Sequence, residues 1–334
     1  MNEFIKKSTC NVLASLKVDG MMRYLNRTKL MVVMYHGVTR NRYDPPVWTQ
    51  LPEEIFLAQM KYIKSHYNIL HLSSFISFLR SGKDLPDRSA LITFDDGLRN
   101  NYSVAFPILK RLTIPATIFL TTNFIDTERI FWFDELLFLI RQKVKQNEKI
   151  VDEIMANFGS RYRNDVWNAY FYMVNKMKRM SEDERNIIMD QLRDNMKMDS
   201  GLMLDDFGLM KWDHILEMER SGIIDFGAHT ANHRILANIS EELWDEEMKE
   251  PRATLSKILG KDIVSFCFPN GIPEVDFNER HIDYLRACGY ICAFTTEASL
   301  YSPGKVDPFR IGRIPAGNDL TSHMAFFKLA CAGL

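Results

Sequence analysis

Two adjacent carboxylates are the residues of this 334-residue chain that most directly suggest chemistry. Asp95 and Asp96 follow an apolar run at residues 91–94 and precede Gly97. Like charges at a strand end repel each other and resist burial, so a cation is the simplest group that would compensate them. One carboxylate could then bind a metal while the other moves protons on an activated water. The structural alternative is an Asp-Asp-Gly turn that closes a hairpin.

The second half of the chain contains a pair of histidines four residues apart. His229 and His233 follow another apolar run, and their spacing would place both imidazoles on one side of a helical turn. Two histidines and one aspartate suit Zn²⁺ and other divalent first-row metals, and they leave coordination positions open for water and substrate. The five cysteines form no Cys-x-x-Cys pair of the kind that structural zinc favours. The pattern therefore indicates a catalytic metal.

Five short motifs occur in a fixed order along the chain: MYHGV at 34–38, TFDDG at 93–97, HTANH at 229–233, FPNG at 268–271 and RIGR at 310–313. In identity and spacing they resemble the polysaccharide deacetylases of the NodB-homology type, a carbohydrate esterase family, over about residues 30–130 and 212–315. The resemblance implies a distorted (β/α) barrel of about seven strands. It also implies that Asp95 is the general base and that the metal ligands are Asp96, His229 and His233. Zn²⁺ is the expected metal, with Co²⁺, Ni²⁺, Mn²⁺ and Fe²⁺ as alternatives.

The general acid does not follow from the usual family motif. That family places its acid histidine in a late Leu-x-His motif, and none occurs after residue 290. His36 ends the first apolar run and resembles a histidine of deacetylases that act on poly-N-acetylglucosamine, so we expect His36 to be the acid. The alternative is a neutral histidine bonded to a strand-end carbonyl.

The third motif also departs from the family pattern Arg-x-Pro-Tyr, because Cys267 and Asn270 occupy the outer positions. We expect Arg313 to supply the missing charge by clamping a carboxylate, the alternative being a surface ion pair. The backbone N–H near Asn270 is expected to face the oxyanion, and its amide side chain indicates a sugar pocket unlike that of chitin or peptidoglycan enzymes. Thr230 could bond a substrate acetate oxygen or cap the turn.

Short apolar runs rich in β-branched and aromatic residues predict buried parallel strands at 31–34, 91–94, 116–120, 223–226 and 264–268. Amphipathic segments between them, such as 55–64 and 241–259, predict helices. This alternation predicts an α/β fold. In such barrels chemistry gathers at the carboxyl ends of the strands, where the motif residues follow the predicted strands directly.

The predicted organisation is one barrel with additions. It comprises a helical arm at 1–28, the barrel at 29–130 and 211–320, a helical insertion at 131–210 and a C-terminal tail at 321–334. The insertion is charged, methionine-rich and helix-prone. A lid or substrate platform and a helical subdomain that only protects an edge are both open interpretations.

Composition limits the function classes. The chain is 46% hydrophobic with a formal net charge of −1, which allows a full core and argues against nucleic acid as a partner. No apolar run predicts a signal peptide or a transmembrane segment, and five scattered cysteines suit a reducing compartment, so we expect a cytoplasmic protein. Lysines among apolar residues at 4–25 could give weak docking to a membrane surface, although a packed amphipathic helix is favoured.

The combined prediction is metal-dependent hydrolysis of an N-acyl group, chiefly N-acetyl, from a sugar in glycan or surface-polysaccharide biosynthesis. The partner would be an N-acylated sugar or glycan, with a nucleotide or lipid carrier as options. Two alternatives remain open: an O-acetyl esterase or deformylase on such a carrier, and a catalytically silent glycan-binding protein. Retention of both Asp95 and Asp96 argues against the silent form, because binding alone needs no base.

Overall fold

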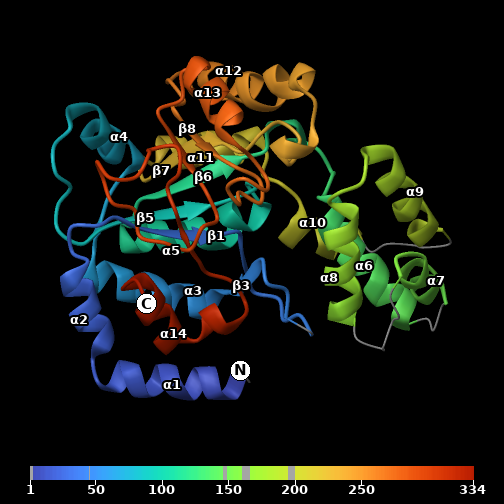
Figure 1. Ribbon diagram of the computed structural model, residues 1–334, viewed down its shortest axis with the longest axis horizontal. Coiled ribbons are helices and arrows are strands. Elements are labelled where there is room, and N and C mark those ends of the chain that lie inside the picture. The colour runs from blue at the N-terminus through green and yellow to red at the C-terminus, as the bar shows by residue number, and fades with distance from the viewer. Residues whose placement is uncertain (1–2, 45, 146–148, 160–165, 195–199) are drawn as a thin grey trace. The chain divides into compact units, whose positions relative to one another are not determined.

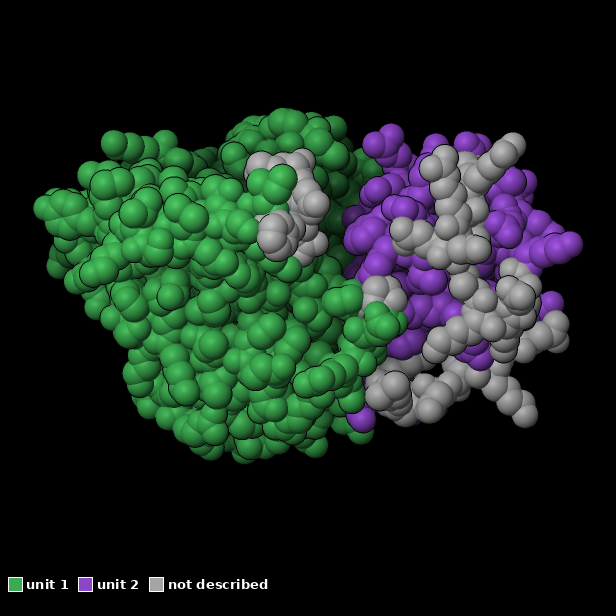
Figure 2. Space-filling model, turned by 90° about the horizontal axis from the view of Figure 1, so that it is seen from below, with its two compact units in different colours: residues 1–127, 209–334 green, residues 128–208 purple. Residues whose placement is uncertain are grey.

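A computed structural model describes residues 3–44, 46–145, 149–159, 166–194 and 200–334. The chain forms two compact units, coloured separately in Figure 2. The first comprises Met1–Thr127 and Leu209–Leu334, and the second comprises Glu128–Gly208. All eight residues singled out above for the site belong to the first unit.

The first unit is built on a parallel sheet of eight strands (Figure 1). Seven of them follow one path in the order β10 (Ile314–Pro315), β1 (Met31–Tyr35), β5 (Ser89–Phe94), β6 (Ala116–Leu120), β7 (Ile224–Ala228), β8 (Ser265–Cys267) and β9 (Cys292–Phe294). The short strand β4 (Asn68–Ile69) pairs with β5, and β2 (Gly37–Thr39) pairs with β3 (Gln50–Pro52) in a separate small sheet. Phe294 of β9 also forms a parallel bridge with Ile311, which brings the two ends of the path together.

The apolar runs identified in the sequence become the inner strands because they are buried on both faces. Every residue of β1, β5 and β6 is buried, as expected for parallel strands covered by helices. The predicted α/β class and distorted barrel of about seven strands are confirmed. Of the five predicted runs only that of β6 matches at both ends. Strands β1, β5 and β7 differ from their predicted runs by one or two residues at one or both ends, and β8 is shorter by one residue at each end.

Helices flank the sheet on both sides, with α12 and α13 above it and α3 and α14 below it in Figure 1. Those that complete the β/α alternation are α3 (Glu53–His66), α4 (Leu72–Ser81), α5 (Phe106–Leu112), α11 (Trp212–Arg220), α12 (Glu250–Leu259) and α13 (Glu279–Ala287). The predicted helix at 55–64 lies within α3. The predicted single helix at 241–259 is instead three pieces: a 3₁₀ turn at Glu241–Leu243, a π-helical turn at Asp245–Lys249, and α12.

Both ends of the described chain pack on the barrel. Helices α1 (Glu3–Ser15) and α2 (Val18–Leu25) lie beside α14 (Met324–Cys331), and Asn26 Nδ2 donates a hydrogen bond to the Ala332 carbonyl at 2.8 Å. Residues 321–334, treated above as a tail, contribute Phe327 and Cys331 to the main core. Large apolar side chains nevertheless stay exposed on α1, on α2 and between them: Ile5, Val12, Leu16, Met21, Tyr24 and Leu25. Weak docking of this face to a membrane surface stays a prediction. Within the described residues, no helix combines the length and apolarity needed to span a bilayer.

The second unit is helical and has its own apolar core. It contains α6 (Trp132–Lys145), α7 (Ile150–Asn157), α8 (Val166–Met177), α9 (Glu182–Arg193) and α10 (Ser200–Phe207). Fully buried Leu136, Ile140 and Met173 anchor this core, consistent with the amphipathic patterns there. Residues 146–148, 160–165 and 195–199 of the predicted insertion lie outside the described residues. A role as lid or platform stays a prediction.

Candidate active site

The two adjacent carboxylates take different partners because the backbone turns sharply between them. Strand β5 ends at Phe94, and the Asp95 N–H still donates to the Tyr35 carbonyl of β1 at 2.9 Å. Asp96 then adopts φ 75° and Gly97 φ 81°, in the left-handed region that few non-glycine residues adopt. Both carboxylates are buried, with 3% and 2% exposure. The hairpin alternative is wrong, since β5 lies in a parallel sheet and its chain continues into α5.

Asp96 meets both motif histidines. Its Oδ1 lies 3.5 Å from His229 Nε2 and 3.2 Å from His233 Nε2, and these three ligand atoms could hold one metal ion. Oδ1 is buried, and among the described residues no group donates a hydrogen bond of normal geometry to it. Burial disfavours charge on Asp96, but the attraction of the two histidines prevails and holds the pKa of Asp96 well below its ordinary value.

The orientation of His229 fits a cation at this place. Its Nδ1 lies 2.8 Å from the Cys267 carbonyl, which can only accept, so Nδ1 carries the proton and donates. Nε2 then faces the carboxylate of Asp96 either with a second proton, which the raised pKa of His229 favours without metal, or with a lone pair. A divalent metal ion would take the place of that proton between Nε2 and the carboxylate. The donor set therefore fits a divalent metal of the Zn²⁺ type.

The local backbone at the histidine pair differs from the expectation. The spacing predicted a helical turn, but residues 229–233 form an irregular loop after β7, so that prediction is wrong. Thr230 and His233 have φ values of 59° and 57°, again in the left-handed region. The loop begins where the His229 N–H donates to the Leu120 carbonyl of β6 at 2.9 Å. The imidazoles converge through this tertiary arrangement and not through helical periodicity.

Asp95 is held by Arg313, which precedes β10. Arg313 Nη1 lies 2.6 Å from Oδ1 of Asp95 and Nη2 lies 2.8 Å from Oδ2, a bidentate pair in which the arginine is fully buried. Arg313 Nε also donates to the Thr295 carbonyl at 2.8 Å. Burial by itself would raise the pKa of Asp95, but the charge and hydrogen bonds of Arg313 outweigh it and keep that pKa below its ordinary value. A surface ion pair, the alternative for Arg313, is therefore wrong.

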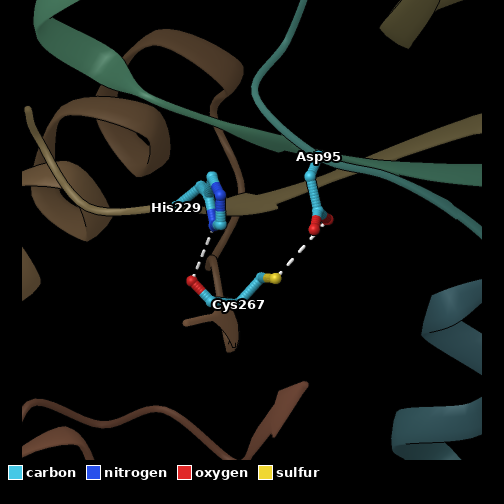
Figure 3. A group of neighbouring side chains, drawn as sticks. All are labelled: Asp95, His229 and Cys267. Atoms are coloured by element: carbon cyan, nitrogen blue, oxygen red, sulfur yellow. Dashed lines mark hydrogen bonds between the residues drawn. The ribbon is translucent and has the colours of Figure 1, made fainter. Parts of the chain in front are cut away.

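Cys267 completes the surroundings of Asp95 (Figure 3). Its thiol lies 3.4 Å from Asp95 Oδ1 and donates to it, while its carbonyl accepts from His229. Burial raises the pKa of this thiol, so it stays protonated and suits a donor better than a metal ligand. Asp95, His229 and Cys267 are close enough to form a second metal-ligand group, but Asp95 and the thiol already pair with each other. The group around Asp96 is the better metal site. In the sequence, Cys267 stands out only as a departure from the family motif.

His36 follows β1 at the same edge of the sheet. Its ring packs against Trp48 with centroids 5.0 Å apart, and its carbonyl accepts from Asn101 Nδ2 at 2.6 Å. Burial lowers the pKa of His36, even though Asp96 and Asp95 act in the opposite direction, so the ring is neutral near pH 7. Its role as the acid stays a prediction.

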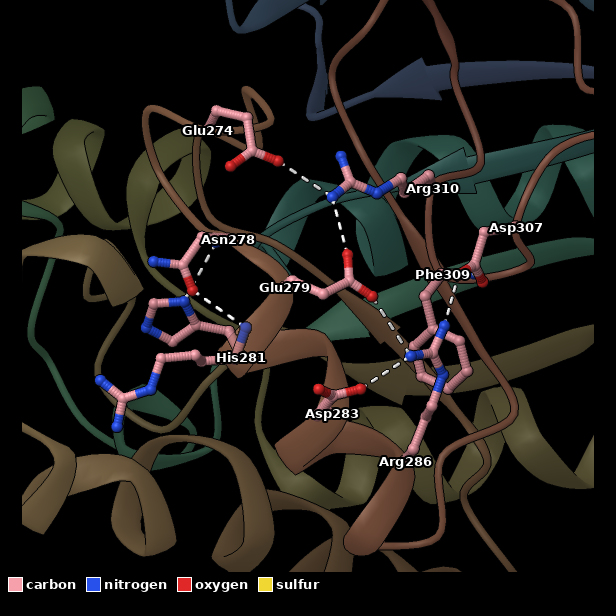
Figure 4. A network of polar contacts seen from close by, with 10 residues as sticks. Glu274, Asn278, Glu279, His281, Asp283, Arg286, Asp307, Phe309 and Arg310 are labelled. Carbon is pink, nitrogen blue, oxygen red and sulfur yellow. Dashed lines mark hydrogen bonds and ion pairs between the residues drawn. The ribbon is translucent and has the colours of Figure 1, made fainter.

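Asn270 follows β8 in a turn of its own. It has φ 59°, and its carbonyl accepts a hydrogen bond from the Thr296 hydroxyl. The chain beyond it is tied down by a surface network, in which Arg310 Nη2 contacts Glu274 at 2.9 Å and Glu279 at 3.0 Å (Figure 4). Each exposed pair adds little stability, but several together restrict where the loop can lie.

Thr230 directly follows His229, the first of the two histidines of the candidate metal site. Its side chain is fully buried, and its hydroxyl has no hydrogen-bond partner among the described residues. A buried hydroxyl without a partner carries a desolvation cost, which a bound substrate oxygen or water would relieve. Substrate contacts by Thr230 and Asn270 stay predictions.

A parallel (β/α) barrel that carries an Asp-His-His cluster and a buried, arginine-clamped aspartate at its strand ends has groups that could support hydrolysis by an activated water. The family model described as polysaccharide deacetylase matches residues 82–293. The chain therefore belongs to the polysaccharide deacetylase family.

Individual relatives agree with this assignment. A poly-beta-1,6-N-acetyl-D-glucosamine N-deacetylase of Staphylococcus aureus is 31% identical over 175 residues, which is 50% of this chain and 57% of that protein. This chain thus spans little more than half the length of that relative. The structure of IcaB from Ammonifex degensii matches with a TM-score of 0.58 at 19% identity, covering 90% of this chain and 97% of that one. The Streptococcus pyogenes deacetylase PplD, in complex with acetate, gives 0.58 at 16% identity, covering 90% and 98%. The structural matches concern the fold alone.

Proposed function

We propose that this chain is a metal-dependent N-deacetylase that removes an acetyl group from an amino sugar in a glycan or its precursor. The observation that carries the proposal is that a candidate base and a candidate metal-ligand cluster lie side by side in one buried site. Asp95 is kept ionised by Arg313, 2.6 Å away, next to the cluster formed by Asp96 and two histidines. A base beside a metal-ligand set is what amide hydrolysis by activated water needs. The name of the Staphylococcus aureus relative supports the substrate class.

Asp96, His229 and His233 would hold the ion, with Zn²⁺ the first choice and Co²⁺, Ni²⁺, Mn²⁺ or Fe²⁺ as alternatives. When bound, the metal would lower the pKa of a water and polarise the acyl carbonyl. Asp95 would take the proton of the attacking water, and Arg313 would hold its carboxylate ionised and fixed in orientation. The backbone N–H near Asn270 would stabilise charge that develops on the acyl oxygen.

The leaving amine needs a proton, and we assign the role of proton donor to His36. Because burial lowers the pKa of His36, the ring starts neutral, so it would have to take up the proton that Asp95 removed from the water before passing it to the amine. Asp95 holds the proton of the water after the attack, so Asp95 is the alternative donor. If His36 is the donor, a His36 variant should slow departure of the amine. If Asp95 is the donor, a His36 variant should not.

We further propose that the protein acts in a reducing compartment, the cytoplasm. All five cysteines are free. Cys292 and Cys331 are buried in apolar clusters, and Cys267 is buried beside Asp95. Burial raises the pKa of all three thiols, which keeps them protonated and unreactive. Fractionation of cells that produce the full-length protein checks this proposal. Recovery only outside the cytoplasmic membrane would contradict it.

A substrate panel tests the function and its alternatives. Amine release would be measured from N-acetyl and N-formyl sugars in free, nucleotide-linked, lipid-linked and oligomeric form, together with acetate release from O-acetyl sugars. Amine release from N-acetyl substrates that requires the metal supports the proposal. Release of acetate only from esters would favour the esterase. If the metal-loaded protein binds glycans but releases nothing from any substrate, the silent binding alternative is favoured.

A further inference from the structure

Glu247 is a carboxylate that the proposed reaction does not use, yet it is completely buried, with 0% exposure. It lies in the π-helical turn Asp245–Lys249, the element that interrupts the helix expected at 241–259. A buried carboxylate is costly unless hydrogen bonds and opposite charge compensate it. Its partners therefore indicate why the fold retains it.

The described partners of Glu247 belong to, or directly follow, the loop that carries the metal-ligand histidines. Oε2 accepts from the N–H groups of Ala231 at 3.1 Å and Asn232 at 2.9 Å. Oε1 accepts from Asn232 Nδ2 at 2.9 Å and lies 3.4 Å from Nη1 of Arg234. One side chain thus bonds the two consecutive backbone amides that lie between Thr230 and His233.

This loop needs external support because its own backbone is unfavourable. Thr230 and His233 both have positive φ, which costs free energy for residues with a Cβ unless the surroundings impose it. The loop lacks the regular hydrogen bonds of a helix, and the Glu247 carboxylate takes the place of backbone acceptors for two of its amides. π-helical turns are frequent at functional sites, and here one carries the carboxylate that supports the loop.

We propose that Glu247 is a positioning residue for the metal site, and this proposal rests on the metal site proposed above. Its carboxylate fixes residues 230–233 so that His229 Nε2 and His233 Nε2 stay converged on Asp96. Glu247 itself lies outside the ligand set. It therefore acts on metal affinity through loop geometry. Residues that orient metal ligands typically change affinity by about 10- to 100-fold when altered.

The test compares Glu247→Gln and Glu247→Ala with Glu250→Gln, an exposed glutamate just beyond the same π-helical turn. Zn²⁺ affinity would be measured on each folded protein by competition with a chromogenic chelator, and the thermal midpoint of the metal-free form would be recorded. Glutamine has the same shape but is neutral and has only one acceptor oxygen. With that oxygen at the Oε2 position, both backbone bonds lose their charge assistance and the NH₂ group faces the donors Asn232 Nδ2 and Arg234. In the opposite orientation both backbone bonds are lost. We expect roughly 10-fold weaker Zn²⁺ binding for Glu247→Gln, a larger loss for Glu247→Ala, and less than about twofold change for Glu250→Gln.

Hydrogen exchange gives a second readout that does not depend on metal. In metal-free Glu247→Gln, the amides of Ala231 and Asn232 should exchange faster than in wild type, while those of β7 should not. Wild-type affinity in a folded Glu247→Gln protein, with unchanged exchange at Ala231 and Asn232, would overturn the positioning role. Failure of the wild type itself to bind metal would instead overturn the proposed function.

Discussion

The guanidinium of Arg313 contacts the carboxylate of Asp95 with both terminal nitrogens, at 2.6 and 2.8 Å, and neither side chain is accessible to solvent beyond a few per cent. Two segments far apart in the sequence thus meet at one buried ion pair. Removing one partner of such a pair leaves the other charged and buried without compensation. The pair should therefore influence both stability and the protonation of the proposed base.

The first prediction concerns stability. Arg313→Met should lower the free energy of unfolding by about 3–5 kcal/mol, because Asp95 would stay buried without its cation. Denaturant unfolding at neutral pH measures this loss. The double variant Arg313→Met with Asp95→Asn should be less destabilised than the sum of the single variants. Arg310→Met is the matched control, since its partners are exposed glutamates and its loss should stay below about 1 kcal/mol. Strictly additive single effects at Asp95 and Arg313 would contradict the coupling.

The second prediction concerns pH. The folded pKa of Asp95 lies below its ordinary value, so its contribution to stability is complete above the unfolded pKa and is lost as pH falls through the folded pKa. At neutral pH Asp95 is ionised. In Arg313→Gln burial would dominate, the pKa of Asp95 would rise, and the acid limb of the kcat/KM profile should move to higher pH. A profile with its acid limb unchanged in this variant would show that Arg313 does not set the protonation of the base.

The third prediction concerns the metal. Saturating Zn²⁺ should raise the thermal midpoint of the wild type, with a stabilisation of about 2.7 kcal/mol when free metal is 100 times the dissociation constant. His233→Ala should abolish most of this gain, because one of the three ligands is lost. Binding should weaken in acid, since histidine must be neutral to bind the ion. Differential scanning fluorimetry with and without a chelator checks all three expectations. An equal rise in His233→Ala would place the metal elsewhere.

The fourth prediction concerns the proposed acid. His36→Gln should lower kcat by about 10²- to 10⁴-fold, the usual range for loss of a general acid or base, while metal content stays unchanged. Turnover of N-acetyl and O-acetyl substrates separates the roles, because an ester leaving group needs less protonation than an amine. Full activity of His36→Gln on N-acetyl sugars would contradict the role of His36 as the acid. It would support the alternative of a neutral structural histidine, with Asp95 as the proton donor.

The sequence predicted buried parallel strands and an α/β fold because parallel strands covered on both faces must be apolar at nearly every position, as β1 and β5 are. The barrel of about seven strands was implied by the family resemblance. Asp95 and Asp96 stood out for a similar physical reason, since adjacent carboxylates at a strand end require compensation. The clustering of Asp96, His229 and His233 was expected from the family resemblance, and the structure brings these side chains together.

Other features depend on contacts that local patterns do not encode. The helical turn expected for the histidine pair is a loop whose amides bond Glu247, a contact set by tertiary packing. Glu247 itself lies in the acidic run 245–247, and such a run normally indicates a solvated face. The thiol of Cys267 contacts Asp95 only because β5 and β8 converge in the barrel. Of these positions only Cys267 had a signal in the sequence, because it replaces a motif arginine.

The most direct test of the central claim compares wild type and Asp95→Asn at a temperature where both are folded, with bound metal and amine release measured on the same samples. We expect about one equivalent of divalent metal in both proteins, because Asp95 lies outside the proposed ligand set, and a loss of turnover of about 10²- to 10⁴-fold in the variant. Loss of metal from Asp95→Asn would instead make Asp95 a ligand. Undiminished turnover with metal bound would contradict its role as the base.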